Sequence, residues 1–235
     1  MSMDRRRFLT ISAASFSSAL LACNQNPEKA GRLLDAFEQK NETLERGLFR
    51  HTAIDKVPGS AGVAGNDFPK YFISDRVPVW DTAARGAWTL EITGAVKKPL
   101  TLTLDQLVGL RGISQKVDHF CVEGWNARAE WTGVRMSDLA KLVEPTAEAQ
   151  YVDFVSFDKD YHESWDMDSA MHRQTLIAYG MDGRMLGPGH GAPARLHSPV
   201  KLGYKNTKYL TKIVFMPAKN GGYWSDLGYE WYGGT

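Results

Sequence analysis

Residues 117–125 read Val-Asp-His-Phe-Cys-Val-Glu-Gly-Trp, and this stretch holds Cys121, one of the chain's two cysteines. The run Val117–Phe120 predicts a strand, and Gly124 permits a sharp turn just after it. A thiol at the end of a strand is placed to face a cavity. Cys121 is therefore either a small buried apolar residue, as most free cysteines are, or a ligand for a soft or redox-active metal.

The composition indicates a folded protein with no general attraction to polyanions. The chain has 235 residues, of which 43% are hydrophobic and 23% charged, with 28 basic residues against 27 acidic ones. This length allows one domain or two small ones with a sizeable core. The charge balance disfavours nucleic acid as a partner. Two cysteines exclude a disulfide framework, and no cysteine–histidine cluster has the spacing of a zinc site.

The N-terminal residues predict export. Arg5, Arg6 and Arg7 precede an apolar run at 11–22 that is shorter than the ~20 residues of a membrane span. Adjacent arginines followed by Phe-Leu are typical of a twin-arginine signal, so we expect residues 1–22 to be an export signal. Residues 20–23 resemble a lipobox that would leave Cys23 lipid-anchored; the alternative is a plain signal peptide. The expected location is the periplasm or cell envelope, where a free thiol must be buried or metal-bound.

The rest of the chain divides into a tether and a main domain. Residues 23–67 predict a tether and a lead-in segment, with an amphipathic helix at 32–46 and a loop rich in glycine after Pro58. The main domain is expected at 68–235.

The main domain predicts an α+β fold with mixed, largely antiparallel sheets and few helices. The alternation at 88–96 and 100–104 predicts a hairpin. A helix is expected at 136–143, capped by Ser137 or a neighbour and ending before Pro145. The glycine-rich stretches lack the context of a dinucleotide-binding fingerprint. Further strands are expected at 151–157, 175–179, 194–197 and 209–216.

Residues 190–208 form a second group that suits an anion. Glycines and prolines alternate there with His190, Arg195 and three lysines. Glycines let backbone N–H groups approach a phosphate, and arginine binds phosphate through two hydrogen bonds. The alternative is an ordinary solvated basic loop before the strand at 209–216.

Three motifs taken together resemble a known family. The stretches 118–125, 190–195 and 203–208 resemble, in that order, the sulfite oxidase family of molybdopterin enzymes. The likeness is greatest to the branch of the periplasmic protein-methionine-sulfoxide reductase catalytic subunit, and it covers roughly residues 70–217. It implies the sulfite oxidase-type molybdopterin-binding fold and a molybdenum–molybdopterin cofactor.

The resemblance also implies roles for individual residues. Cys121 corresponds to the thiolate ligand of molybdenum, and Glu123 and Trp125 correspond to the substrate face, where Glu123 is placed to move protons. These three residues are the expected catalytic group. The residues expected to bind the pterin cofactor are Phe72, Ile73, Ser74, Arg76, Ser156, His190, Arg195, Gly203, Lys205, Asn206, Thr207 and Lys208.

The sequence also departs from the sulfite oxidases. Asn126 and Ser74 stand where those enzymes carry arginines that cradle sulfite, and Arg128 lies two residues beyond Asn126. Their dimerisation domain has no counterpart after Lys208, so a monomer is expected. No haem attachment site is present, which implies a separate redox partner, either a membrane haem protein or a cytochrome.

The expected function is therefore that of an exported mononuclear molybdenum oxidoreductase. It would transfer an oxygen atom with two electrons, reducing small-molecule or protein-bound S- or N-oxides, and would touch the membrane only through a lipid anchor at Cys23. One alternative is a sulfite dehydrogenase that passes electrons to a cytochrome. A second is a metal-free lipid-anchored binding module of the same fold. A third is a hydrolase using Cys121 with His119 or His190.

Overall fold

The computed structural model describes residues 27–48, 63–64 and 68–235. The chain divides into two compact units, Met1–Arg50 and His51–Thr235. The expected export signal at 1–22, Cys23 and parts of the tether lie outside the described residues. Within the described residues, no helix combines the length and the apolar character that crossing a membrane requires. The proposed signal, anchor and domain boundaries therefore stay predictions.

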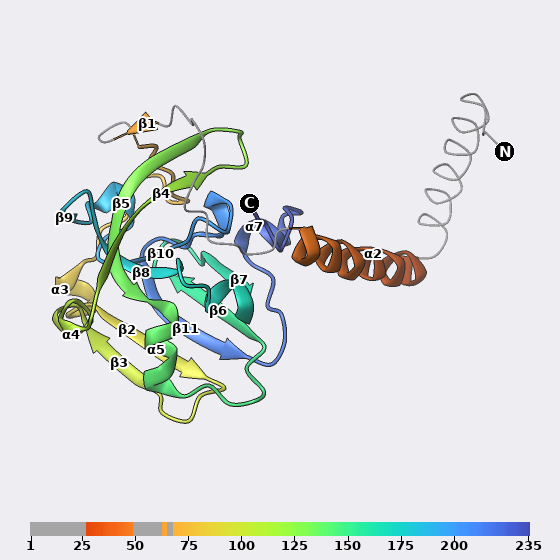
Figure 1. The fold of residues 1–235 in the computed structure, drawn as a ribbon, viewed down its shortest axis with the longest axis horizontal. Coiled ribbons are helices and arrows are strands. Elements are labelled where there is room, and N and C mark those ends of the chain that lie inside the picture. Colours follow the sequence, from red (N-terminus) through yellow and green to blue (C-terminus); the bar gives the residue numbers. More distant parts are fainter. Residues whose placement is uncertain (1–26, 49–62, 65–67) are drawn as a thin grey trace. The chain divides into compact units, whose positions relative to one another are not determined.

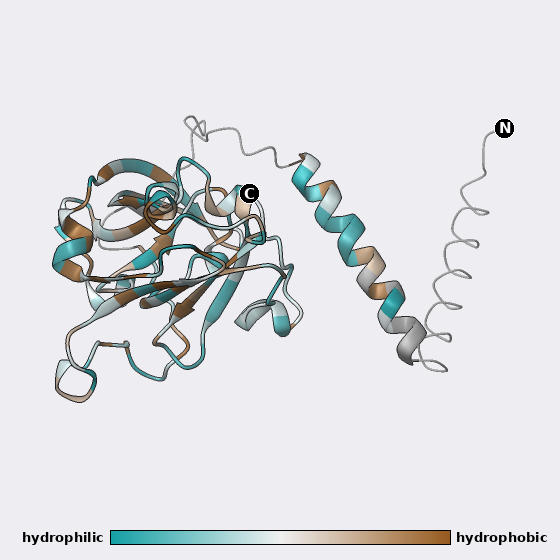
Figure 2. Cartoon of the chain, turned by 90° about the horizontal axis from the view of Figure 1, so that it is seen from below, coloured by the Kyte–Doolittle hydropathy of each residue, from teal (hydrophilic) through white to brown (hydrophobic). Residues whose placement is uncertain are grey.

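The first unit contains the helix α2 (Pro27–Leu48), which includes and extends the helix expected at 32–46 (Figure 1). Glu42 and Arg46 lie one turn apart and form an ion pair at 2.7 Å, a spacing that supports a helix. Figure 2 shows apolar residues set among polar ones along this helix. The apolar side chains of Leu34, Phe37 and Leu44 are exposed.

The second unit is built on two sheets, which confirms the expected α+β fold with largely antiparallel strands (Figure 1). In the first sheet, the long strand β5 (Asn126–Arg135) pairs antiparallel with β4 (Ile113–Phe120) and with β8 (Leu176–Met181). The remaining strands of this sheet are β1 (Val63–Ala64), β9 (Arg184–Met185) and β10 (Arg195–His197), of which only β1 runs parallel to its neighbour.

The second sheet has the order β3-β2-β11-β6-β7. Its first two strands, β2 (Thr89–Gly94) and β3 (Leu100–Thr103), pair antiparallel with Leu90 opposite Leu102, which confirms the expected hairpin. The central strand is β11 (Leu210–Met216), which is parallel to β2 and antiparallel to the next strand. The other two strands are β6 (Tyr151–Ser156) and β7 (His162–Asp166).

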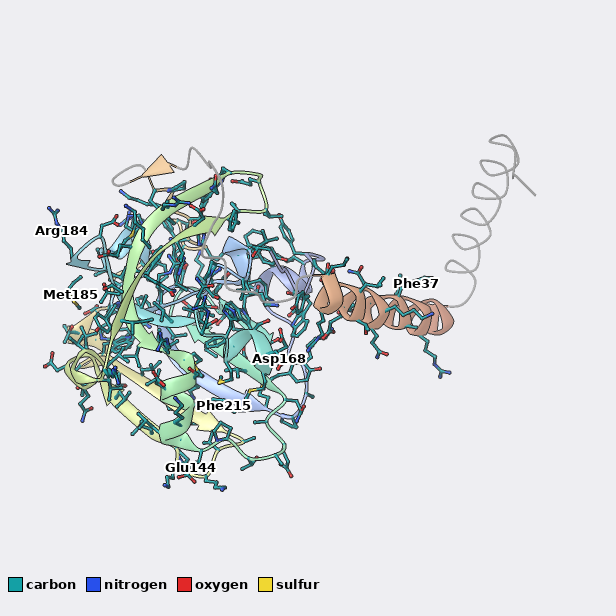
Figure 3. The ribbon with its side chains drawn as sticks, in the orientation of Figure 1. Phe37, Glu144, Asp168, Arg184, Met185 and Phe215 are labelled. Carbon is teal, nitrogen blue, oxygen red and sulfur yellow. The ribbon has the colours of Figure 1, made fainter. Side chains whose placement is uncertain are left out.

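The helices of this unit are short. The helix α5 (Met136–Val143) has the expected bounds, but Ser137 does not cap it. Arg135 holds the N-cap position without a side-chain hydrogen bond, because the chain passes from β5 directly into α5. At the other end Glu144 takes the left-handed conformation with φ 52°, and Figure 3 places it at the outer end of the helix. The others are α3 (Thr82–Arg85), α4 (Leu104–Gly109), α6 (Met167–Ala170), α7 (Tyr223–Asp226) and the 3₁₀ turns η2 (Pro188–His190) and η3 (Gly203–Lys205).

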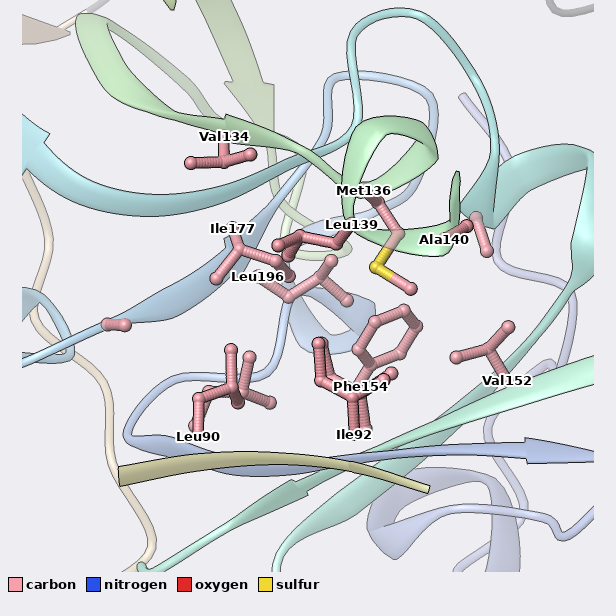
Figure 4. Packing of buried hydrophobic residues seen from close by; sticks show 14 of the residues in the cluster. Leu90, Ile92, Val134, Met136, Leu139, Ala140, Val152, Phe154, Ile177 and Leu196 are labelled. Carbon is pink, nitrogen blue, oxygen red and sulfur yellow. The ribbon is translucent and has the colours of Figure 1, made fainter. Parts of the chain in front are cut away.

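The main core lies where α5 packs with strands of both sheets. Met136 and Leu139 of α5 meet Leu90 and Ile92 of β2 and Phe154 of β6, and all five are fully buried (Figure 4). A second cluster gathers around the buried indole of Trp131 on β5. These two clusters fix the ends of β4, β6 and β10, and the connections that follow those strands form the site.

Candidate active site

Cys121 lies in the tight turn that joins β4 to β5. Its N–H donates to the Trp125 carbonyl at 2.9 Å, and the Gly124 N–H donates to the Cys121 carbonyl at 3.0 Å. Gly124 has φ +85°, a conformation that other residues rarely adopt. The thiol is half-buried, and partial burial raises its pKa. The turn therefore fixes the direction of the sulfur through backbone bonds.

The Glu123 carboxylate is held beside this sulfur. One carboxylate oxygen accepts a hydrogen bond from the Trp125 indole at 2.9 Å and from the Tyr71 hydroxyl at 3.0 Å. The same oxygen lies 3.9 Å from Cys121 Sγ. Both hydrogen bonds lower the pKa of Glu123, and the one from Trp125 has the larger effect. The rings of Tyr71 and Trp125 stack with centroids 6.0 Å apart, which fixes both donors.

A cavity of about 510 Å³ opens next to Cys121. It brings together five separate parts of the chain: residues 68–73, the turn after β4, the end of β6, the segment from β10 to β11, and the C-terminal residues 223–229. Ten of the fifteen residues expected at the site line it. They are Phe72, Ile73, Cys121, Glu123, Trp125, Ser156, Arg195, Gly203, Asn206 and Lys208.

The other five expected residues lie behind or beside the cavity wall. The Ser74 N–H donates to Asp158 at 3.1 Å, so it orients a carboxylate that does line the cavity. The fully buried Lys205 points away from the cavity and pairs with Glu163 at 2.5 Å. Arg76 is exposed and His190 is half-buried, while Thr207 is buried and its hydroxyl has no hydrogen-bond partner among the residues that the structure describes.

Two cationic side chains of the cavity bind backbone carbonyls rather than carboxylates. Arg195 is fully buried and donates to the carbonyls of His190 at 3.1 Å and Asn206 at 3.3 Å. Lys208 donates to the carbonyl of Gly189 at 2.9 Å and to that of Tyr71. Among the described residues, neither forms an ion pair. A buried charge without a counter-charge is costly, so this pair favours an anionic ligand.

Burial, together with the neighbouring cations, lowers the pKa of several basic groups around the cavity. Burial and the neighbouring Arg195 lower the pKa of Lys208 to about 6. Burial, Arg195 and Lys208 together lower the pKa of His190 to about 4 and that of His119 to about 3. Burial alone lowers the pKa of Arg195 to about 10. An anion bound among these groups would relieve their mutual repulsion.

These features fit a phosphate-bearing metal cofactor. Cys121 supplies a thiolate-forming sulfur, and Arg195 and Lys208 supply positive charge without a carboxylate partner in the described part of the chain. Several buried polar atoms around the cavity also lack a hydrogen-bond partner among the described residues. They include His119 Nδ1, His190 Nδ1 and the hydroxyls of Thr207 and Tyr209. Such atoms are costly unless a ligand or water satisfies them.

Several residues that line the cavity are not indicated by any pattern in the sequence. Tyr71 is 52 residues from Glu123 in the chain, and no spacing rule connects the two. Asp158 and Tyr209 also line the cavity. The concentration of aromatic residues at 223–232 is visible in the sequence and was the available signal for Tyr223, Trp224 and Tyr229, which complete the cavity mouth.

A cysteine and two cationic side chains that line one cavity suit a metal cofactor that carries phosphate, as in molybdenum oxidoreductases. The chain belongs to the family described as oxidoreductase molybdopterin binding domain, whose pattern matches residues 76–224. The resemblance drawn from the three motifs is thereby confirmed, together with the fold, the enzyme class and the molybdopterin cofactor. Residues 118–208, which hold all three motifs in full, lie within the matched range.

Three known proteins are similar to this chain. A protein of Azospira oryzae named protein-methionine-sulfoxide reductase subunit YedZ1 is 35% identical over 98% of this chain and 88% of its own length. The protein-methionine-sulfoxide reductase catalytic subunit MsrP of Xanthomonas campestris pv. campestris is 36% identical over 62% of this chain and 50% of its own. The sulfane dehydrogenase SoxCD of Paracoccus pantotrophus matches with a TM-score of 0.53 and 22% identity over 56% of this chain and 39% of its own, a likeness of fold alone.

Proposed function

We propose that this protein is an exported molybdenum oxidoreductase that removes oxygen from neutral S- or N-oxides, with electrons supplied by a separate redox protein. The substrate is either a small molecule or an oxidised side chain of another protein, and the electron donor is a membrane haem protein or a cytochrome. The observation that carries the substrate class is the Glu123 carboxylate beside Cys121 Sγ. A fixed negative charge at this point repels an anion such as sulfite and tolerates a neutral oxide.

The nearest arginine along the chain supports the same choice. Arg128 donates from Nε and from one terminal nitrogen to the two carboxylate oxygens of Asp118, at 2.8 Å each, so its charge is already matched. Asn126 stands where a sulfite-binding arginine would stand in the sulfite oxidases. The cations that do line the cavity, Arg195 and Lys208, are tied to backbone carbonyls deep in it and suit the phosphate of the cofactor.

The chain's own residues would divide the work as follows. Cys121 would hold the molybdenum, while Arg195, Asn206 and Lys208 would bind the pterin and its phosphate. When bound, this cofactor supplies the two-electron redox change and takes up the oxygen atom. The net reaction consumes one oxide, two electrons and two protons and yields the reduced compound and water. Glu123 lies at the point where these protons must arrive.

The aromatic residues at the mouth would bind the body of the substrate and limit access of water. Tyr71 and Trp125 stack on one another, and Tyr223, Trp224 and Tyr229 also line the cavity. Aromatic faces bind apolar and sulfur-containing groups well. The names of the Azospira and Xanthomonas relatives refer to methionine sulfoxide, and those relatives support a sulfoxide over sulfite for this chain.

The substrate class is tested with purified, cofactor-loaded protein in two assays. We expect turnover of methionine sulfoxide or trimethylamine N-oxide with reduced viologen as electron donor. Sulfite oxidation with ferricyanide should be slower by at least ~100-fold, because sulfite must approach a like charge at short range. Activity in the sulfite assay alone would replace this proposal with the sulfite dehydrogenase. Absence of molybdenum by elemental analysis would favour the metal-free binding module.

The variant Glu123→Gln tests the carboxylate itself. It keeps the shape of the side chain and removes one negative charge, so kcat/KM for sulfite should rise about tenfold. The matched control is Glu148→Gln, an exposed carboxylate that does not line the cavity. If sulfite oxidation stays unchanged in Glu123→Gln, the charge at the mouth does not select the substrate.

Export and anchoring belong to the same proposal and rest on the sequence of residues 1–23. A twin-arginine signal exports folded protein, which suits a cofactor inserted before export. The double variant Arg5→Lys and Arg6→Lys should keep cofactor-loaded protein in the cytoplasm, as measured by cell fractionation. Cys23→Ser should prevent lipidation, as measured by the mass of the mature N-terminus. Normal export of the lysine variant would contradict the twin-arginine route.

A further inference from the structure

Tyr209 has a strained backbone at the edge of the cavity. It lies between Lys208 and the first residue of β11, and its φ of 58° places it in the left-handed region. A residue with a large side chain rarely adopts this conformation, because it is sterically strained. Such strain persists only where the surroundings impose it. Two backbone bonds do so here: the Tyr209 carbonyl accepts from the Phe157 N–H at 2.9 Å, and the Tyr209 N–H donates to the Gly191 carbonyl at 3.4 Å.

This conformation brings the Tyr209 side chain into the cavity wall. The residue is 1% exposed, its ring packs against Phe157 with centroids 5.3 Å apart, and it lines the cavity that Cys121 also lines. Lys208 Nζ lies 5.8 Å from the centre of the ring. The hydroxyl is fully buried and has no hydrogen-bond partner in the described part of the chain.

Tyr161 provides the comparison within the same cavity. It also lines the cavity, but its hydroxyl donates to the backbone carbonyl of Tyr204. The Tyr161 hydroxyl therefore has a hydrogen-bond partner within the protein, whereas the Tyr209 hydroxyl has none among the described residues. A buried hydroxyl without a partner is unfavourable, so strain and an unsatisfied group are combined at a single residue.

We propose that Tyr209 is a cofactor-binding residue whose hydroxyl donates a hydrogen bond to an acceptor atom of the bound pterin cofactor. This inference rests on the cofactor assigned to the cavity and adds a residue that neither the three motifs nor the family resemblance supplies. Burial and the nearby Asp158 raise the pKa of Tyr209 to about 12, so the phenol stays protonated and acts as a donor. A neutral donor complements Arg195 and Lys208, whose positive charge an anionic cofactor would stabilise.

The test removes only the oxygen, in the variant Tyr209→Phe, with Tyr161→Phe as the matched control. Molybdenum and released pterin are measured per chain, and the rate of cofactor loss is followed in mild urea. The melting temperature is measured separately on protein produced without cofactor. We expect Tyr209→Phe to lose cofactor ~10–100-fold faster than the wild type. Its cofactor-free melting temperature should stay the same or rise, because an unsatisfied buried group is removed.

Tyr161→Phe should behave in the opposite way. Its cofactor-free melting temperature should fall by about 2–4 °C, since the Tyr204 carbonyl loses its donor. If Tyr209→Phe retains its cofactor as well as the wild type does, the inference is wrong. It is also wrong if cofactor-free Tyr209→Phe loses as much stability as Tyr161→Phe, because such a loss indicates a structural role for the hydroxyl. If the wild-type protein itself contains no molybdenum, the proposed function is wrong as well. The failure of the Tyr209 inference and the failure of the proposed function are therefore distinguishable.

Discussion

Replacing Cys121 by alanine should abolish molybdenum binding and lower turnover at least ~100-fold, while the protein stays folded. Cys121 is the sole cysteine in the described residues, and the sequence contains one other, Cys23. The turn around Cys121 is held by the backbone hydrogen bonds to Trp125 and from Gly124, which alanine retains. The thiol is half-buried and belongs to neither hydrophobic cluster, so the free energy of unfolding should change by no more than ~1 kcal/mol.

Molybdenum content by elemental analysis and the melting temperature of cofactor-free protein check this prediction independently. Cys121→Ser is the closer variant, because it keeps a polar atom at the same position while replacing the soft sulfur ligand. Cys23→Ala is the control, since it removes the other thiol of the sequence. Full molybdenum content and turnover in Cys121→Ala would show that another group holds the metal.

Cys121 could be found from the sequence because local features define it. A short strand, a glycine at the turn and the following Glu-Gly-Trp place a thiol at a strand end, and the structure puts it at the cavity. The bounds of α5 are likewise local, since Pro145 excludes a longer helix. The strand β5 was missed because three of its five buried positions are Ala127, Ala129 and Gly133, which carry little strand preference.

Contacts between distant segments could not be predicted in this way. Tyr71 meets Glu123 across 52 positions, and Lys205 meets Glu163 across 42. The lysines of 201–208 all suggest an anion-binding loop by composition, yet only Lys208 lines the cavity. The other two lysines form ion pairs instead, Lys205 with Glu163 and Lys201 with Asp166. Both carboxylates lie on β7, a strand that the sequence patterns do not predict.

The pairing of Lys205 leads to a second large effect. Lys205 and Glu163 are both fully buried, with Lys205 Nζ 2.5 Å from a carboxylate oxygen. Burial lowers the pKa of Lys205 and raises that of Glu163, so each depends on the other to stay charged. Lys205→Met should lower the free energy of unfolding by ~3–5 kcal/mol, because it leaves a buried carboxylate without its counter-charge. Urea unfolding of cofactor-free protein measures this change.

Lys208→Met is the matched control, since it changes another lysine of the same loop. Lys208 lines the cavity and forms no ion pair among the described residues, so its loss should leave cofactor-free stability within ~1 kcal/mol and should reduce cofactor retention. The double variant Lys205→Met with Glu163→Leu should recover much of the stability lost by Lys205→Met, because no buried charge remains. The opposite pattern, with Lys205→Met stable but unable to retain cofactor, would show that Lys205 binds the cofactor directly.

The Lys205 pair should also affect the cavity mouth. The other oxygen of the Glu163 carboxylate accepts a hydrogen bond from the Trp224 N–H at 3.0 Å, and the Lys205-bound oxygen accepts one from the Ser225 hydroxyl at 3.3 Å. Trp224 lines the mouth, so one buried carboxylate connects β7, the loop at 203–208 and the C-terminal aromatic segment. Glu163→Gln should therefore raise KM for a sulfoxide more than it lowers kcat, because it loosens the side of the mouth that binds substrate and leaves Cys121 in place. A fall in kcat with unchanged KM would place the effect at the metal rather than at the mouth.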